Sequence, residues 1–305
     1  SKMEDEASFL CCIIDCHPQY WYDSTSQQKT KLAVDVFINS VLVFLNAFLT
    51  LHRGNKLAVI GINPKISKLI YLSQTESQSN VNDDDEKINA IKKKKSGALD
   101  YCGGAEFSYS EMNEKVTKTL QEITLKFAQS YGDKKCADGS LLAGGLSHAL
   151  CILNKVLIKD LPHIEPRVLC IYSSKDISSQ YIPIMNCIFS AEKRSILIDS
   201  CVLTSDDSLF LQQAASITNG IYSKPPHIKG LSQHLLMTYL STGAVRKHLS
   251  LPITQKVDFR ASCFCHQTPV DVGVVCPVCL SIFCQQSPIC KTCGTRFPRR
   301  KMLKQ

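Results

Sequence analysis

The chain has 305 residues, of which 44% are hydrophobic and 20% are charged, and its formal net charge at pH 7 is +8. These values are ordinary for a soluble globular protein, and the length allows one large domain and a small one. The most apolar helical stretch, Leu32 to Leu51, contains Asp35, Asn39, Ser40 and Asn46. It is too polar to span a membrane, so we expect a buried core helix there.

The net charge comes from two short basic runs. Lys92–Lys95 supplies four positive charges, and Arg299, Arg300, Lys301 and Lys304 supply four more. The 35 Lys and Arg residues less these eight leave 27, equal to the 27 Asp and Glu residues. We therefore expect a neutral folded body. The runs are interpreted as solvated loops or tails, with nuclear import or loose contact with polyanions as the alternative.

Short apolar runs alternate with longer helical stretches along most of the chain. The runs predict strands at Phe9–Asp15, Lys56–Ile62, Ser67–Leu72, Arg167–Tyr172, Ser195–Val202 and Gly220–Tyr222. The stretches between them predict helices at Lys29–Leu51, 110–130, Ser140–Leu157, Ser178–Lys193, Ser208–Thr218 and Leu231–Leu240. Such alternation is typical of βαβ units, so we expect an α/β fold with a mostly parallel sheet and helices on both of its faces.

Two segments do not fit this sheet. Residues 73–110 are polar and contain an acidic run followed by a basic run, which predicts a disordered surface insertion. The segment from Ser250 to Ser262 contains Pro252 and is interpreted as an extended linker. The expected organisation is an α/β domain at 1–249, the linker at 250–262, a zinc module at 263–298 and a basic tail at 299–305.

Seven of the sixteen cysteines lie between residues 263 and 293, where Cys276/Cys279 and Cys290/Cys293 form two CxxC pairs. A CxxC pair can bind one metal ion from a single tight turn, and two pairs supply the four soft ligands that tetrahedral zinc prefers. A disulfide cluster would need an oxidising compartment and a secretory signal, and the acidic residues before the apolar run 7–16 do not fit one. We therefore expect an intracellular protein with structural Zn²⁺.

The other cysteines of this region leave the number of zinc ions open. In a cross-brace module, Cys263, Cys265 and His266 would face Cys284, but Ser287 occupies the next ligand position, so this site is expected to be incomplete. A rival arrangement joins Cys263 and Cys265 to the first CxxC pair. We favour Cys276, Cys279, Cys290 and Cys293, because CxxC is the more usual spacing. Neither arrangement clearly leaves a ligand position open for water, which disfavours catalytic zinc.

The α/β part lacks the common catalytic motifs. It contains no phosphate loop, dinucleotide glycine pattern or nucleophile elbow. His148 lies within a helix and has no placed carboxylate partner, so we interpret it as a helix-face residue. Asp15 is more informative, because it ends the first strand, where open parallel sheets present ligand sites. We expect no catalytic residue in the chain and no cofactor besides zinc.

Asp15, the helix entry at 138–150 and the segment 212–220 together resemble a von Willebrand factor A domain. That resemblance implies a metal-ion-dependent adhesion site, which begins with Asp-x-Ser-x-Ser after the first strand. Here Asp15 is followed by His17 and Gln19 at the two hydroxyl positions. Mg²⁺ requires oxygen ligands in a strict octahedron, so we expect no functional metal at Asp15.

The C-terminal region extends the resemblance. The runs Val257–His266, Val275–Cys284 and Pro288–Cys293 are very similar to the Tfb4 family, the smaller von Willebrand-A subunit of the transcription and repair factor TFIIH. The resemblance implies a nuclear, non-catalytic structural subunit that supports RNA polymerase II transcription initiation and nucleotide excision repair. It also implies other TFIIH core subunits as partners, above all the larger von Willebrand-A subunit with its zinc modules. No small-molecule substrate, membrane contact or sequence-specific nucleic-acid binding is expected.

Two other functions compete with this one. A RING-like ubiquitin ligase would need a complete cross-brace, and Ser287 disfavours it. A zinc-ribbon nucleic-acid binder is disfavoured because residues 263–290 contain Asp271 and no Lys or Arg. On this reasoning, two fully loaded zinc ions would favour the ligase and one would favour the structural subunit.

Overall fold

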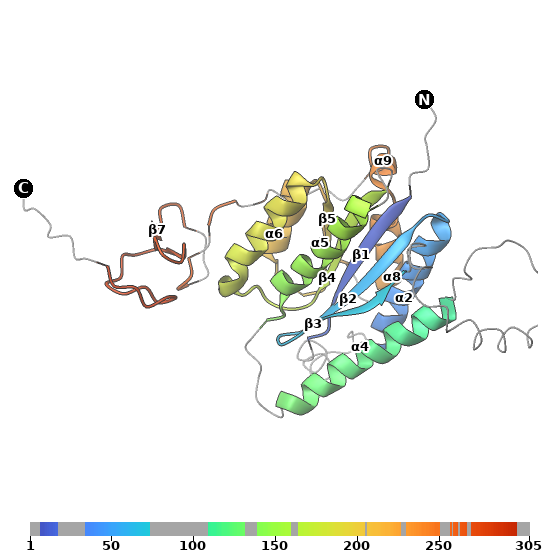
Figure 1. Cartoon of the computed structure of the whole chain (residues 1–305), viewed down its shortest axis with the longest axis horizontal. Coiled ribbons are helices and arrows are strands. Elements are labelled where there is room, and N and C mark those ends of the chain that lie inside the picture. Colours follow the sequence, from blue (N-terminus) through green and yellow to red (C-terminus); the bar gives the residue numbers. More distant parts are fainter. Residues whose placement is uncertain are drawn as a thin grey trace, which may run out of the picture.

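The computed structural model describes residues 7–17, 34–73, 109–131, 139–159, 164–204, 206–226, 230–250, 257, 259–261, 263–266 and 270–297. A six-stranded sheet with the order β3-β2-β1-β4-β5-β6 forms the centre of the molecule (Figure 1). Its strands are β1 (Ser8–Asp15), β2 (Lys56–Ile62), β3 (Ser67–Leu72), β4 (Glu165–Tyr172), β5 (Leu197–Val202) and β6 (Tyr222–Ser223). Neighbouring strands are parallel, except that β3 pairs antiparallel with β2. The predicted mostly parallel sheet is confirmed.

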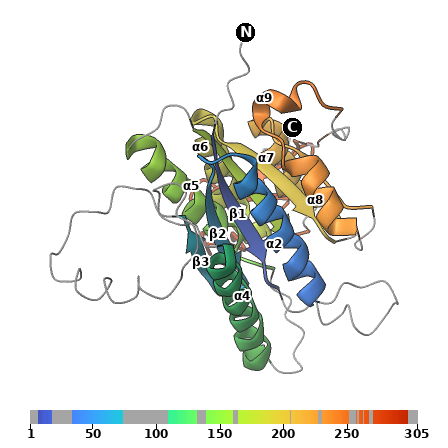
Figure 2. The ribbon, with the colours of Figure 1, turned by 90° about the vertical axis from the view of Figure 1, so that its right-hand side faces the viewer.

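Helices cover both faces of this sheet, as expected (Figure 2). One face packs against α2 (Val34–Leu51), α4 (Tyr109–Tyr131) and α8 (Leu231–Tyr239). The other packs against α5 (Leu142–Lys159), α6 (Tyr181–Lys193) and α7 (Leu209–Thr218). All eight residues of β1 are buried, because the strand lies in the middle of the sheet with a hydrophobic cluster on each side. This double burial explains why β1 is a continuous apolar run.

The structure differs from the expected elements at a few points. The helix expected from Ser178 starts as a short 3₁₀ turn, Ser178–Gln180, and becomes α-helical at Tyr181. Sequence reasoning missed the four-residue helix α9 (Gly243–Arg246) and two short strands in the cysteine region. Most of the expected insertion at 73–110, much of the linker and the whole basic tail lie outside the described residues. Within the described helices, none combines the length and apolar character needed to cross a bilayer.

Helix α5 lies unusually close to the sheet. A β-carbon on Gly145 would lie only 2.8 Å from Ile62 Cγ2 and 3.1 Å from Ile13 Cγ2. Glycine weakens a helix by about 1 kcal/mol relative to alanine, so the contact explains why the chain has glycine at this point. The close approach brings the residues just before α5, including Ser140, next to the carboxyl ends of the strands.

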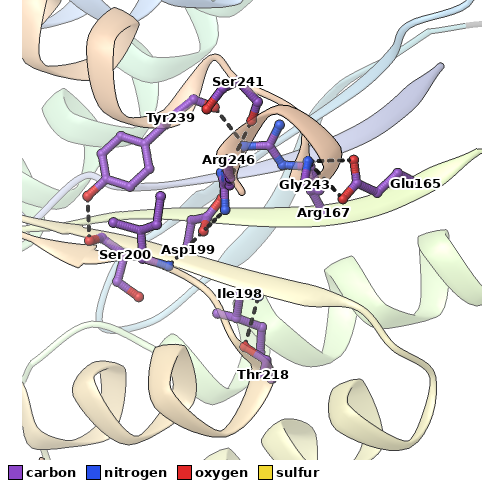
Figure 3. A network of polar contacts seen from close by, with 11 residues as sticks. Glu165, Arg167, Ile198, Asp199, Ser200, Thr218, Tyr239, Ser241, Gly243 and Arg246 are labelled. Atoms are coloured by element: carbon purple, nitrogen blue, oxygen red, sulfur yellow. Dashed lines mark hydrogen bonds and ion pairs between the residues drawn. The ribbon is translucent and has the colours of Figure 1, made fainter. Parts of the chain in front are cut away.

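A buried ionic cluster joins helices α8 and α9, the last two helices of the α/β domain, to the sheet (Figure 3). Arg246 of α9 binds Asp199 of β5 through two contacts, Nη1 to Oδ1 at 2.8 Å and Nη2 to Oδ2 at 2.6 Å. Arg167 of β4 reaches the same carboxylate at 3.2 Å and the Tyr239 carbonyl at 2.7 Å. Glu165 accepts a hydrogen bond from the Gly243 backbone nitrogen at 3.0 Å. Helices α8 and α9 are therefore tied to β4 and β5 by polar contacts as well as by apolar packing.

The Asp199 carboxylate stays ionised in this cluster. Burial alone would raise the pKa of Asp199, but hydrogen bonds from Arg246 and the charges of both arginines hold it below its usual value. The carboxylate also accepts a hydrogen bond from the Ile221 backbone nitrogen at 2.9 Å. A fully buried carboxylate of this kind depends on its partners, because an uncompensated charge in the interior is strongly destabilising.

Candidate metal centre

The cysteine region, residues 263–297, has few buried apolar side chains among its described residues. Strands β7 (Val274–Val275) and β8 (Ile282–Phe283) form a short antiparallel hairpin. The buried centre consists of Phe283, Cys276 and Cys290, with Phe264 and Phe297 packed against it. Such a core is too small to hold a fold by hydrophobic burial alone, and cysteine-rich modules of this size generally derive their stability from a bound metal.

The two CxxC pairs adopt the same backbone turn. Cys276 and Cys290 each donate a backbone hydrogen bond to the carbonyl five residues later, at 2.9 and 2.8 Å. Each also accepts one from the backbone nitrogen four residues later, at 2.9 Å in both turns. The residue after the second cysteine is left-handed in both cases, with φ of 59° at Leu280 and 74° at Gly294. The repeated turn aims two thiols in the same direction from each pair.

The four cysteines of these two turns, Cys276, Cys279, Cys290 and Cys293, form one set of possible metal ligands. We call this set the second quartet, because another set, the first quartet described below, begins earlier in the chain. The four sulfur atoms of the second quartet all lie within 4.8 Å of one another. Cys276 Sγ is 3.7 Å from Cys293 Sγ, and Cys279 Sγ is 3.6 Å from Cys290 Sγ. The edge of a zinc–thiolate tetrahedron with bonds of 2.3 Å is about 3.8 Å, so the donors fit zinc. This is the set that the sequence favoured.

The remaining ligands form a first quartet of Cys263, Cys265, His266 and Cys284. His266 Nδ1 lies 3.2 Å from Cys265 Sγ and 3.3 Å from Cys284 Sγ, and the two sulfur atoms are 3.6 Å apart. These spacings also suit a tetrahedral zinc site with three sulfur ligands and one nitrogen.

The first quartet corrects one sequence expectation and decides against the rival arrangement. We expected an incomplete site because Ser287 lacks a ligand atom, but His266 supplies the fourth donor next to Cys265. The rival joining of Cys263 and Cys265 to Cys276 and Cys279 is not the arrangement found. The two quartets are interleaved along the chain, in the cross-brace manner.

Neighbouring hydroxyl groups favour the thiolate form of Cys279 and Cys293, two of the four ligands of the second quartet. The Ser281 hydroxyl lies 3.2 Å from Cys279 Sγ, and hydrogen bonding to Ser281 lowers the pKa of Cys279 to about 6. The Thr295 hydroxyl lies 3.0 Å from Cys293 Sγ and lowers the pKa of that thiol in the same way. Because zinc binds the thiolate, these contacts favour the ligand form. Four protein donors fill each tetrahedron, so a metal held there would be structural.

Both carboxylate oxygens of Asp15 accept hydrogen bonds from other groups of the chain. Its Oδ1 accepts hydrogen bonds from the Ser140 hydroxyl and from the His17 backbone nitrogen at 3.1 Å. Its Oδ2 accepts from the Ser174 hydroxyl at 2.5 Å and from the Ser173 backbone nitrogen at 3.0 Å. The carboxylate, which is 1% exposed, joins the ends of β1 and β4 to the segment before α5. Gln19 lies outside the described residues.

Sequence reasoning noticed Asp15 but missed both hydroxyl partners. Ser140 lies 125 residues further along the chain and Ser174 lies 159 residues further, and the two hydroxyls are themselves 2.9 Å apart. The order of the strands could have indicated Ser174. The residues that follow neighbouring parallel strands lie at the same edge of the sheet, and Ser174 comes shortly after β4, the strand next to β1.

An open, mostly parallel sheet with an antiparallel edge strand, a carboxylate at the end of β1 and helices on both faces defines a von Willebrand factor A-like domain, here followed by a cysteine module. The family model described as "Transcription factor Tfb4" matches residues 7–294. The chain therefore belongs to the Tfb4 family.

Similar proteins support this assignment. "General transcription factor IIH subunit 3" from Dictyostelium discoideum is 40% identical over 275 residues, which cover 89% of this chain and 70% of that protein. "General transcription and DNA repair factor IIH subunit TFB4" from Arabidopsis thaliana is 35% identical, over 99% of this chain and 92% of that one. The crystal structure of the TFIIH p34 N-terminal domain has the same fold, with a TM-score of 0.57 and 22% identity, over 77% of this chain and 99% of that one.

Proposed function

We propose that this chain is a non-catalytic structural subunit of TFIIH that acts in the nucleus, in RNA polymerase II transcription initiation and in nucleotide excision repair. The observation that supports this most directly is the Tfb4 family match, which runs through both the α/β domain and the cysteine module. The names of the Arabidopsis and fission yeast relatives include both transcription and DNA repair.

The geometry of the polar sites supports a non-catalytic role. Asp15 lies where open parallel sheets bind their ligands, but both of its oxygens already accept two hydrogen bonds from the chain. Each cysteine quartet supplies four protein ligands, which leaves no position of a tetrahedral ion for water or substrate. We propose that zinc fills both quartets and that its role is to hold the module in shape.

Exposed apolar side chains support a role in protein assembly. In the cysteine module, four apolar residues within one nine-residue segment are more than half exposed, namely Val272 at 84%, Val275 at 51%, Val278 at 65% and Leu280 at 58%. Apolar surface of this kind is commonly covered by partner subunits in permanent complexes. We propose the larger von Willebrand-A subunit of TFIIH as the main partner, as the family resemblance implies.

Affinity purification from nuclei tests this proposal. A tagged full-length chain, expressed in cells of its own organism, should recover the other TFIIH core subunits in comparable amounts after a high-salt wash. A matched variant such as Leu280→Asp should recover them less well than Leu280→Ala, because a charge is added to the exposed apolar surface. Recovery of the tagged chain without any TFIIH subunit would contradict the proposal.

A RING-like ubiquitin ligase is the second candidate, and one observation favours it. His266 completes the first quartet, so the module has the interleaved pair of sites that a RING-type ligase needs. The zinc count consequently no longer separates the two functions, because the structural subunit is now also expected to hold two ions. Ubiquitin transfer in a reconstituted assay separates them directly.

A further inference from the structure

A row of aromatic rings connects the α/β domain to the cysteine module. Tyr181, at the start of α6, lies 5.6 Å from Phe210 of α7 between ring centroids. Tyr181 also lies 6.4 Å from Phe264 of the module between ring centroids, with the rings nearly perpendicular at 83°. Phe264 in turn lies 6.4 Å from Phe283 of β8. These separations lie within the range in which aromatic pairs attract one another beyond simple burial.

The domain side of this contact is held in place by contacts within the domain itself. Tyr181 follows directly on the 3₁₀ turn at Ser178–Gln180, and the Gln180 side chain bonds both the Ala143 backbone nitrogen and the Ser140 carbonyl. Phe210, on which Tyr181 packs, is 5% exposed and belongs to the core under α5, α6 and α7. The domain therefore offers a preformed aromatic edge to the module.

The module side depends on the first quartet. Phe264 lies between two ligands, Cys263 and Cys265, and its backbone nitrogen donates to the Ile282 carbonyl at 2.8 Å. The Cys263 sulfur also accepts hydrogen bonds from the backbone nitrogens of Cys265 and Cys284, at 3.4 and 3.3 Å. A metal ion bound to Cys263, Cys265 and Cys284 would therefore hold the backbone on either side of Phe264. The few apolar side chains of the module supply little else to do so.

We infer that the first quartet, through Phe264, determines how the cysteine module is placed against the α/β domain. Figure 1 shows the module on the side of the domain that carries α6. Zinc in the first quartet would fix Phe264, and Phe264 would fix the module at Tyr181. Both rings on the module side adjoin first-quartet ligands in sequence, Phe264 between Cys263 and Cys265 and Phe283 directly before Cys284, whereas no second-quartet ligand adjoins either ring. This inference does not depend on any TFIIH partner.

Photocrosslinking of the purified full-length chain tests the inference. Benzoylphenylalanine at position 181 should crosslink to the peptide that contains residues 263–266, as identified by mass spectrometry. The same probe at position 189 is the matched control, because Phe189 lies on the same helix and is 52% exposed. The crosslink from position 181 should be lost after zinc removal with a chelator, in the His266→Ala variant and in the Phe264→Ala variant. The last variant keeps every ligand and should retain its full zinc content.

The possible results separate the inference from its alternatives. A crosslink that survives zinc removal at full yield would overturn it, because the module would then be placed without the metal. Equal crosslinking from positions 181 and 189 would also overturn it, because the contact would then be unspecific. The chelator experiment needs no ligand substitution, so it tests whether metal places the module even where a variant fails to fold. Because a chelator removes zinc from both quartets, the His266→Ala variant assigns the effect to the first quartet.

Discussion

The sulfur atom of Cys284 lies 3.6 Å from that of Cys265, 19 residues earlier in the chain. The first CxxC pair lies between these two residues in sequence but belongs to the other quartet. The ligands of the two quartets therefore alternate along the chain. A metal ion bound to either quartet would close a loop of the chain that contains at least one ligand of the other quartet. Loss of either ion should consequently disturb the whole module.

Zinc content is the first prediction. The purified chain should hold about two zinc ions, and His266→Ala or Cys284→Ser should hold about one, because a tetrahedral site with three protein ligands binds far more weakly. The Cys290→Ser/Cys293→Ser double variant should lose the ion of the second quartet. Native mass spectrometry measures these values. An unchanged zinc content in the double variant would refute the assignment of the second quartet, and Cys151→Ser, outside both quartets, is the control.

Asp15 should act as a structural residue. Replacing it with alanine leaves two serine hydroxyls and two backbone nitrogens without their acceptor, so we expect a loss of about 2–4 kcal/mol in the free energy of unfolding. Added Mg²⁺ or Mn²⁺ should not raise the melting temperature of the unaltered chain. Tight binding of either ion that disappears in Asp15→Ala would show that Asp15 is a metal ligand after all.

Asp199 should make stability depend on pH. Its pKa lies below its usual value, so its contribution to stability is present above that value and is lost as the pH falls below about 4. Asp199→Asn leaves two buried arginines without a carboxylate and should lower the free energy of unfolding by about 3–5 kcal/mol at neutral pH. It should also flatten the acid side of the profile. Chemical denaturation at several pH values measures both effects.

A matched control exists for this prediction. Asp206 pairs with Lys175 at 3.3 Å on the surface, where both side chains are mostly exposed. Asp206→Asn should change stability by less than about 1 kcal/mol. Similar losses in the two variants would mean that the Asp199 cluster contributes no more than a surface pair.

The polar stretch within 73–110 should be replaceable. The structure limits the replaceable segment to residues 74–108. Ser73 is hydrogen-bonded to Leu57 through both its backbone nitrogen and its hydroxyl, and α4 begins at Tyr109. A short Gly-Ser linker in place of residues 74–108 should leave the melting temperature nearly unchanged, since long surface loops close at little entropic cost. A fall of more than roughly 5 °C, which exceeds about 1 kcal/mol, would show that the segment packs on the domain.

The fold could be predicted from sequence because its signals are local. The buried strands are continuous apolar runs, and the helices between them have apolar faces, so alternation alone indicates a parallel sheet. Helix α9 was not predicted because four residues show no periodicity, and because the carboxylate that binds Arg246, that of Asp199, lies 47 residues earlier in the chain. Strands β7 and β8 escaped because each has only two residues.

The metal centre could be predicted only in part, for a similar reason. The CxxC spacing identifies the second quartet, since each pair is a local turn. The first quartet joins Cys263, Cys265 and His266 to Cys284 through the β7–β8 hairpin, so it depends on tertiary structure. The usual cross-brace spacing predicts the last donor of this site at residue 287, whereas the structure groups His266, which directly follows Cys265, with the three cysteines.

Co-expression with the larger von Willebrand-A subunit of TFIIH tests the proposed function most directly. We expect a stable heterodimer that survives about 0.5 M salt in size-exclusion chromatography, because a largely apolar contact is little screened by ions. The contradicting result is a chain that remains monomeric beside that subunit and transfers ubiquitin when supplied with activating and conjugating enzymes.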